Sequence, residues 1–183
     1  RHLGNPTAAS GHNIHRLLVS PLDPDRLYRQ CYGGVYRSDD GGLNWIDIGA
    51  GLPSDFGYAI ALSDRDDDSL WIIPVASNHL RTMPGGRLRV YTSDDGGRHW
   101  QAQWRGLPQQ HVHVTVLREA LALLTGPGRT RVFFGTSSGH LFASHDAGRH
   151  WQRIAEFLPR ILSVRTDRVP ARTTPHPPGT GAA

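Results

Sequence analysis

Length, composition and charge limit what this chain can be. Its 183 residues suffice for one domain, and no apolar run reaches the roughly 18 to 20 residues that a membrane-spanning helix needs, so we expect no membrane partner. The net charge of +4 comes from 20 cationic side chains, all Arg, that are scattered among 16 acids without a basic stripe. This distribution argues against nucleic-acid binding. The single Cys31 excludes an internal disulfide and leaves the redox compartment open.

The first part of the chain predicts four short strands. Alternating apolar residues, with β-branched and aromatic enrichment, mark the segments 14–20, 27–32, 35–38 and 45–49. Pro21 and Pro24 set the first turn, and Gly33-Gly34 reads as a two-residue hairpin. We therefore expect an antiparallel four-stranded unit.

The same pattern recurs twice more. The second unit predicts strands at 57–63, 70–77, 88–93 and 100–104, and the third predicts strands at 112–117, 132–137, 140–144 and 151–157. Four antiparallel strands in about 50 residues are typical of a propeller blade. The predicted fold class is therefore all-β, with about three β-propeller blades and a closing strand.

The acidic run at 64–68 has the alternation of a calcium loop, with Asp64, Asp66 and Asp68. A calcium-binding loop of the EF-hand type would need Gly at its sixth position and Glu at its twelfth, where this chain has Ser69 and Val75. We therefore interpret the run as a solvated turn between two strands and expect no metal site and no cofactor.

A Ser-x-Asp-x-Gly-x-x-Trp motif, called the repeat turn below, occurs once in each unit. Its residues are Ser38, Asp40, Gly42, Trp45, Ser93, Asp95, Gly97, Trp100, Ser144, Asp146, Gly148 and Trp151. The motif falls between the third and fourth strands, where Asp and Ser can accept hydrogen bonds from nearby backbone N–H groups and Gly can adopt a left-handed conformation. Trp then offers a large apolar face for packing. These roles are structural, and they account for the repeated acids without a metal.

Three repeat turns in register, with "GGVYRSDDGG" and "GLP" around them, resemble the Asp-box or BNR repeats of sialidases, sortilin-type receptors and many bacterial sialidase-like or glycosyl-hydrolase-like proteins. The resemblance covers about residues 12 to 166 and is most similar to the C-terminal part of the bacterial BNR-repeat proteins. It implies a β-propeller, whereas function varies within such a fold.

The predicted organisation is a partial propeller. We expect a lead-in at 1–11, blades at about 12–53, 54–108 and 109–159, a closing strand at 160–166 and a disordered Pro-rich tail at 167–183. Propellers typically have four to eight blades, so we expect upstream blades of the same protein.

The resemblance also implies a working face. Ligands of sialidase-like propellers bind on the face without repeat turns, called the turn-free face below, which here carries the long loop at 78–87. The residues expected on it are His12, Asn13, Asp55, Phe56, His79, Arg81, Gln110 and His111. A carbohydrate or protein ligand is expected there.

An enzyme of the sialidase type needs a Tyr nucleophile with a Glu, an Asp acid/base and three Arg that bind the substrate carboxylate. This chain has only two Glu, and Glu156 is expected on an outer strand. Arg118, Glu119 and Asp55 are the remaining catalytic candidates, with a local salt-bridged pair as the alternative reading of the first two. We therefore expect a noncatalytic binding propeller; the alternative is a sialidase-like glycoside hydrolase with part of its site on further blades.

Overall fold

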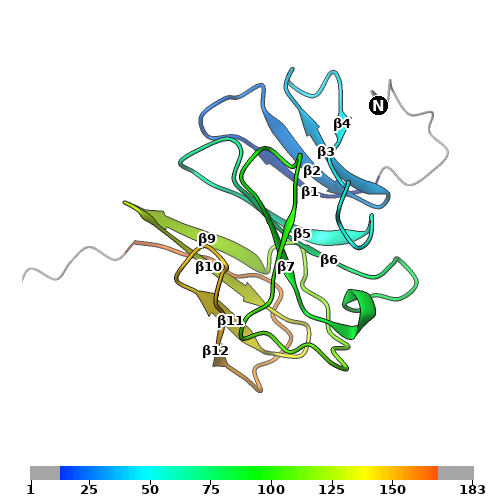
Figure 1. The fold of residues 1–183 in the computed structure, drawn as a ribbon, viewed down its shortest axis with the longest axis vertical. Helices are drawn as coiled ribbons and strands as arrows, with labels where there is room; N and C mark the ends of the chain where they lie inside the picture. Colours follow the sequence, from blue (N-terminus) through cyan, green and yellow to red (C-terminus); the bar gives the residue numbers. More distant parts are fainter. Residues whose placement is uncertain (1–12, 169–183) are drawn as a thin grey trace, which may run out of the picture.

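The fold consists of three antiparallel sheets that follow one another along the chain (Figure 1). The structure is a computed structural model that describes residues 13–168. The first sheet contains β1 (Ile14–Val19), β2 (Leu27–Cys31), β3 (Gly34–Ser38) and β4 (Ile46–Asp47). The second contains β5 (Gly57–Leu62), β6 (Leu70–Pro74), β7 (Val90–Ser93) and β8 (Gln101–Gln103). The third contains β9 (Leu121–Gly126), β10 (Arg129–Gly135), β11 (Leu141–Ser144) and β12 (Gln152–Ala155).

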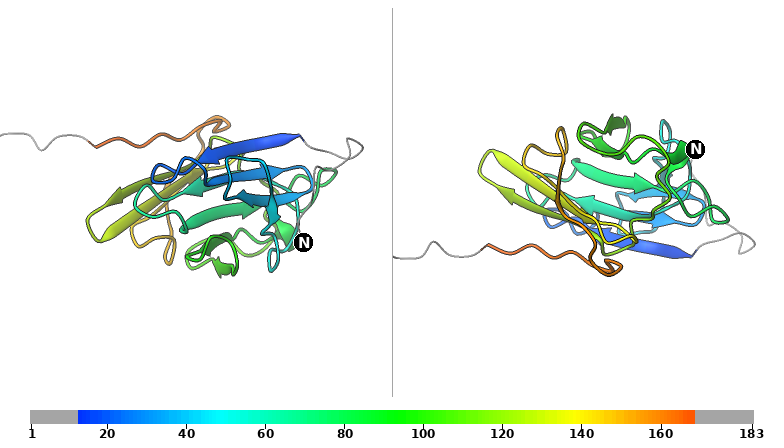
Figure 2. Two further views of the ribbon diagram at one scale, coloured as in Figure 1. Left: turned by 90° about the horizontal axis from the view of Figure 1, so that it is seen from above. Right: turned by 90° about the horizontal axis from the view of Figure 1, so that it is seen from below.

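The sheets have the form of propeller blades. In each one the strands are hydrogen-bonded in sequence order, and β1 packs beside β5 and β5 beside β9. The only helical element in the described residues is a single 3-10 turn, η1 (Pro84–Gly86). Two further views show the sheets as successive layers (Figure 2). The described residues therefore form three blades of a partial β-propeller.

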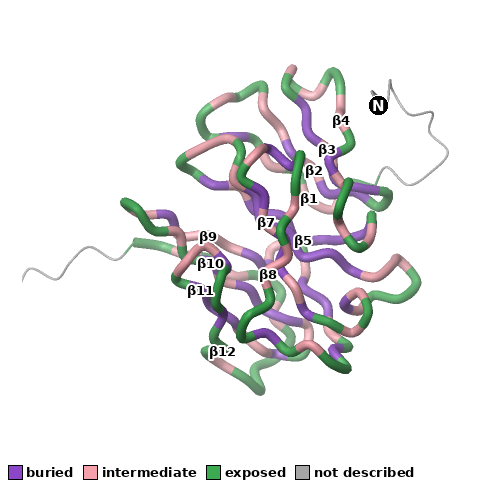
Figure 3. The backbone as a smooth tube through the Cα atoms, viewed as in Figure 1, coloured by how far each residue is buried: buried purple, intermediate pink, exposed green. Residues whose placement is uncertain are grey.

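Apolar cores lie between neighbouring blades. Tyr28 and Val35 of the first blade pack with Ile60 and Ile72 of the second. A larger core joins the second and third blades and includes Trp71, whose ring is 5% exposed. The buried residues accordingly concentrate where the sheets face each other (Figure 3). Burial of this apolar area is the main force that holds one blade on the next.

The first strand of the third blade is not the segment predicted from the alternation at 112–117. That segment is irregular, because Val112 N–H donates to Gly86 O at the end of η1 (3.0 Å) and Thr115 N–H donates to the Ser137 hydroxyl in a turn (2.9 Å), so neither partner lies in a strand. The innermost strand is β9, since it ends the strand order of its sheet opposite β12 and packs beside β5 of the second blade. The alternating apolar residues at 112–117 pack against the core, and the segment forms no β-ladder.

Three smaller predictions also need correction. The first-blade hairpin loop is Tyr32-Gly33, because Cys31 pairs with Gly34. Each repeat-turn Trp precedes its outer strand, which is only two residues long in the first blade. The segment 160–166 runs beside β9, but its β pairing is limited to one isolated bridge, Glu119 to Ser163, and it forms no regular strand (Figure 1).

The repeat turns have nearly identical hydrogen bonds in all three blades. In the second blade the Ser93 hydroxyl donates to Asp95 Oδ1 (2.8 Å) and accepts from Gly97 N–H (2.9 Å). Asp95 Oδ1 also accepts from His99 N–H (2.9 Å), which holds the pKa of that carboxyl well below its usual value. Ser38 and Ser144 make the corresponding bonds. The structural interpretation of the motif therefore has a direct basis in these contacts.

The three tryptophans use the turn differently. Trp45 Nε1 donates to Gly42 O of its own turn (2.9 Å), whereas Trp100 Nε1 donates to Ile48 O of the preceding blade (2.7 Å). Trp151 is buried at 4% exposure and packs edge-on against Phe134, with 5.0 Å between ring centroids. Trp45 therefore contacts its own turn and Trp100 the preceding blade, as expected, whereas Trp151 packs on a strand of its own blade.

The repeat turns share one face with the turns between the first two strands of each blade. Gly41 N–H donates to Asp25 O (2.9 Å), Gly96 N–H to Asp68 O (3.0 Å) and Ala147 N–H to Thr130 O (2.9 Å). Because strand direction alternates within a blade, the inter-blade links and the loops between the second and third strands lie on the opposite, turn-free face.

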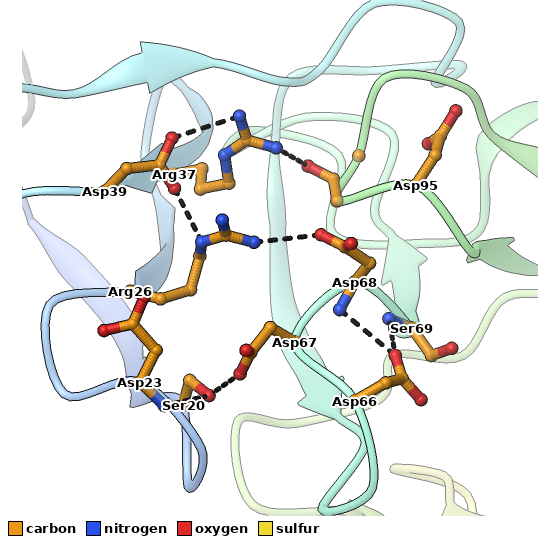
Figure 4. Close-up of polar contacts among 12 residues, drawn as sticks. Ser20, Asp23, Arg26, Arg37, Asp39, Asp66, Asp67, Asp68, Ser69 and Asp95 are labelled. Atoms are coloured by element: carbon orange, nitrogen blue, oxygen red, sulfur yellow. Dashed lines mark hydrogen bonds and ion pairs between the residues drawn. The ribbon is translucent and has the colours of Figure 1, made fainter.

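An ionic latch joins the first two blades on the repeat-turn face (Figure 4). Asp39 pairs with Arg37 (3.1 Å) and Arg26 (2.6 Å), and Arg26 also pairs with Asp68 of the second blade (2.9 Å). Arg37 donates to Gly96 O (3.1 Å), so the guanidinium of one blade meets the repeat turn of the next.

The acidic run at 64–68 is the turn between β5 and β6, as expected, but its acids are not simply solvated. Asp66 accepts from the N–H of Asp68 (3.1 Å), Asp67 accepts from the Ser20 hydroxyl, and Asp68 belongs to the latch. The run therefore connects two blades.

Replacing Asp95 by Ala should lower the free energy of unfolding by about 1 to 3 kcal/mol, because the backbone N–H of His99 and the Ser93 hydroxyl lose their acceptor. Thermal and urea unfolding measure the change. Asp94→Ala is the matched control, since Asp94 is the exposed neighbour in the same turn. Equal stability of the two variants would contradict the structural role.

The repeat turns should also make unfolding sensitive to acid. Burial raises the pKa of Asp146, but hydrogen bonds from His150 and Ser144 outweigh it and bring the pKa to about 2, against a usual 3.8. A lowered folded-state pKa gives stability that is present above the unfolded value and is lost as the pH falls towards 2. Asp146→Asn should therefore be less stable than wild type at pH 6 by about 1 kcal/mol, after allowance for solvent screening, and should match it near pH 2. Urea titrations across that range test this; a constant difference would contradict it.

Candidate functional site at the turn-free face

Aromatic side chains of the two inner strands meet at the turn-free end of the blades. His15 is the second residue of β1, and Tyr58 is the second residue of β5. Their ring centroids are 4.7 Å apart, and Phe56 lies 5.2 Å from each. His15 Nδ1 donates to Gly57 O (2.6 Å), which fixes the ring and turns its other nitrogen away from that bond. The inner strands thus provide a rigid aromatic base.

Two guanidinium groups lie near this base. Arg118 Cζ is 5.0 Å from the centroid of the Tyr58 ring, a cation–π distance. Burial lowers the pKa of His15, the bond to Gly57 O opposes this effect, and the charges of Arg118 and Arg81 lower the pKa further. Both arginines therefore act on the same imidazole. Neither has a carboxylate partner among residues 13–168.

The adjacent carboxylate is already paired. Glu119 accepts from Arg16 of β1 (3.0 Å) and from Arg165 (2.9 Å). Arg16 also donates to Arg118 O, and burial lowers its pKa against the effect of Glu119. The local pair that was the alternative reading of Arg118 and Glu119 is thus a larger network, in which Glu119 binds guanidinium groups from elsewhere in the chain.

These residues form what we call the mouth cluster: His15, Arg16, Tyr58, Arg81, Arg118, Glu119 and Arg165. It carries four guanidinium groups and one carboxylate. Such an arrangement can receive a carboxylate or phosphate through guanidinium N–H groups. The His15 ring gives its one N–H to Gly57 O, so its other nitrogen can only accept a hydrogen bond. A proton transfer by Glu119 would first require it to leave both ion pairs.

The other residues expected on this face are more dispersed. Asn13 and Asp55 are exposed on the segments that lead into β1 and β5, and His79 is exposed in the loop between β6 and β7. Phe56 is only 3% exposed, so its ring belongs to the core and offers no open ligand surface. His111 is exposed on the link between β8 and β9. His12 lies outside the described residues.

Sequence reasoning missed four members of the cluster: His15, Arg16, Tyr58 and Arg165. For His15 and Tyr58 the sequence did contain a usable pattern, because both are the second residue of the first strand of their blade. Arg165 had no such signal, since its contact with Glu119 depends on the path of residues 160–168 beside β9.

The described part of the chain contains no group of three or more His, Cys, Asp or Glu side chains that could hold a metal ion. It also contains no helix long and apolar enough to cross a membrane.

The geometry of the mouth cluster can be tested through His15. Arg118→Gln removes a nearby positive charge that lowers the pKa of His15, so the imidazole should titrate at a higher pH in the variant than in wild type. Two-dimensional NMR of the histidine rings measures both midpoints. Arg149→Gln, on the repeat-turn side of the third blade, should leave the midpoint unchanged. Identical midpoints in wild type and Arg118→Gln would show that the two groups do not interact.

Comparisons with known proteins bear on the fold. No family model matches the chain, and no curated protein matches it. Among solved structures it is similar to an ancestral GH74 enzyme (TM-score 0.61, 17% identity, 79% of this chain and 18% of that one). It is also similar to the GH74 xyloglucanase from Xanthomonas campestris (TM-score 0.60, 22% identity, 84% and 22% of the two chains).

A third similar structure is YCF48 bound to a D1 peptide, with a TM-score of 0.51 and 16% identity over 87% of this chain and 44% of that one. The chain thus spans less than half the length of each of these structures. All are β-propeller proteins, and the likeness shows that this chain has a β-propeller fold.

Proposed function

We propose that this chain is part of a noncatalytic binding propeller of the Asp-box type, and that its turn-free face receives an anionic ligand or partner. The observation that carries the proposal is the guanidinium of Arg118, which lies 5.0 Å from the centroid of the Tyr58 ring without a carboxylate partner among the described residues. Arg81, which is bonded to Asn78 and also has no carboxylate partner in that part of the chain, adds a second positive charge that acts on His15. One guanidinium group over an aromatic base and a second positive charge acting on the same imidazole favour a negatively charged occupant.

The repeat turns support this assignment by elimination. Their serine and aspartate side chains are fully engaged with backbone N–H groups of the same turn, as in Ser93 and Asp95. They hold the blades and have little capacity left for a ligand. The opposite face, with its links and long loop, is then the natural place for recognition.

An acidic peptide is the occupant that we propose for the turn-free face. The mouth cluster is open to solvent at Arg118 and Arg81, which suits an extended chain better than an enclosed small molecule. A propeller of related fold, YCF48, has been solved with a bound D1 peptide, so the fold is compatible with a peptide ligand.

The second candidate, a sialidase-like glycoside hydrolase, has weaker support. Such a site needs a free acid and a Tyr nucleophile assisted by a Glu. Here Glu119 is held by Arg16 and Arg165, and the ring of Tyr58 is 5% exposed beneath Arg118. Asp55 remains exposed on the correct face, and the GH74 neighbours share the fold only. Catalysis by these residues would require rearrangement of the network.

Fluorescence anisotropy with a labelled Glu-rich peptide tests the proposal, with a Lys-rich peptide of equal length as the control ligand. The acidic peptide should bind, more weakly at higher salt, and Arg118→Gln combined with Arg81→Gln should reduce its affinity about tenfold or more. The control variant Arg149→Gln should retain wild-type affinity. Equal binding of both peptides, or no effect of the double variant, would refute the assignment. Release of fluorophore from a sialic acid glycoside, lost in Glu119→Gln, would favour the hydrolase.

A further inference from the structure

A second concave site lies away from the mouth cluster, between the link from β8 to β9 and the outer strands of the third blade. The cavity has a volume of about 580 Å³, within the range of small-molecule sites. Its floor is apolar and includes Leu88, Leu107, Val112 and Phe142, all less than 7% exposed. The site shares no residue with the mouth cluster.

The rim of this cavity is polar and carries no acid. Three imidazoles, His111, His113 and His140, line it together with Gln110 and Arg153. Among the lining residues there is no Asp or Glu. Arg153 pairs directly across the sheet with Phe142, so its guanidinium stands beside the apolar floor. Glu156, which pairs with Arg153 (3.0 Å), lies outside the lining, so the rim favours a negative group over a positive one when that pair opens.

The link that forms one wall of the cavity is held in place on both sides. Leu88 N–H donates to Pro108 O (3.1 Å), and Val112 N–H donates to Gly86 O (3.0 Å). The Gln109 amide adds a bond to Leu88 O (2.7 Å). A wall fixed by these bonds loses little conformational freedom when a ligand enters.

Between these anchors His111 has a φ of 54°, in the left-handed region that favours Gly. The chain keeps a histidine at this strained position, next to the cavity. On the opposite side, the His140 ring is oriented by the Ser138 hydroxyl (2.9 Å from Nδ1). The imidazole of His140 thus has a defined position at the rim.

We propose that this cavity binds a small organic carboxylate with an apolar body. The body would rest on Leu107, Val112 and Phe142, and the carboxylate would accept hydrogen bonds from Arg153 and the rim imidazoles. Arg153 is now paired with exposed Glu156 (3.0 Å), a surface pair that contributes little to stability and can be exchanged for a ligand carboxylate. The inference is independent of the function proposed for the mouth cluster.

Ligand-observed NMR on the full chain provides the test, with benzoate, benzyl alcohol and benzylammonium as probes of one shape and different charge. Benzoate should bind with a Kd on the order of 1 mM, benzyl alcohol more weakly, and benzylammonium not detectably. Equal binding of benzoate and benzylammonium, or no benzoate binding at about ten times that Kd, would overturn the proposal.

Variants assign the signal to the cavity. Arg153→Gln should weaken benzoate binding about fivefold or more, and Val114→Phe, which fills part of the cavity, should abolish it. Arg118→Gln in the mouth cluster and Arg149→Gln on the repeat-turn side should both leave it unchanged. If Val114→Phe fails to fold, the exposed Arg153→Gln still decides the question. Loss of benzoate binding in Arg118→Gln, with Arg153→Gln unaffected, would place the carboxylate in the mouth cluster and refute the cavity site.

Discussion

The repeat turn is the constraint on which the blades depend. A single serine hydroxyl accepts two backbone N–H groups and donates to an aspartate, which accepts the N–H of the residue four positions beyond it. This closes the outer hairpin without a long strand, and β4 is accordingly only two residues long. The fourth residue of the turn also directs its carbonyl to the preceding blade. Arg37 donates to this carbonyl at Gly96, and Trp71 Nε1 donates to it at Ala147. One local motif thus defines both a hairpin and an interface.

The two interfaces satisfy that carbonyl with different chemistry. Arg37 donates to Gly96 O and belongs to the latch with Asp39, whereas Trp71 Nε1 donates to Ala147 O over a larger apolar core. The first interface therefore depends more on charge, and the second depends more on apolar burial. The acidic turn at 64–68 contributes to the charged interface between the first two blades, because Asp68 pairs with Arg26.

The sequence was sufficient for the features that are local and repeated. Ser, Asp, Gly and Trp at fixed spacing predicted the hairpins, the blade boundaries near them and the face on which they lie. It was insufficient where long-range bonds override a local pattern: the alternation at 112–117 predicted a strand, but Val112 bonds to the 3-10 turn and Thr115 to the side chain of Ser137. The mouth cluster was predicted only through Arg81, Arg118 and Glu119. His15 and Tyr58 were missed because a buried aromatic in an inner strand looks like ordinary core, and Arg165 reaches Glu119 only through tertiary structure.

The two faces of the blades differ in how far their polar side chains are engaged within the protein. On the repeat-turn face, polar side chains are engaged in short-range bonds within each turn and in the latch. A ligand bound there would have to break bonds that stabilise the blades. On the turn-free face, the links and the loop between β6 and β7 are anchored by backbone bonds such as Val112 N–H to Gly86 O, which leaves side chains such as Arg118 and His111 available. Under the proposed function, this face can carry the recognition while the repeat turns hold the blades.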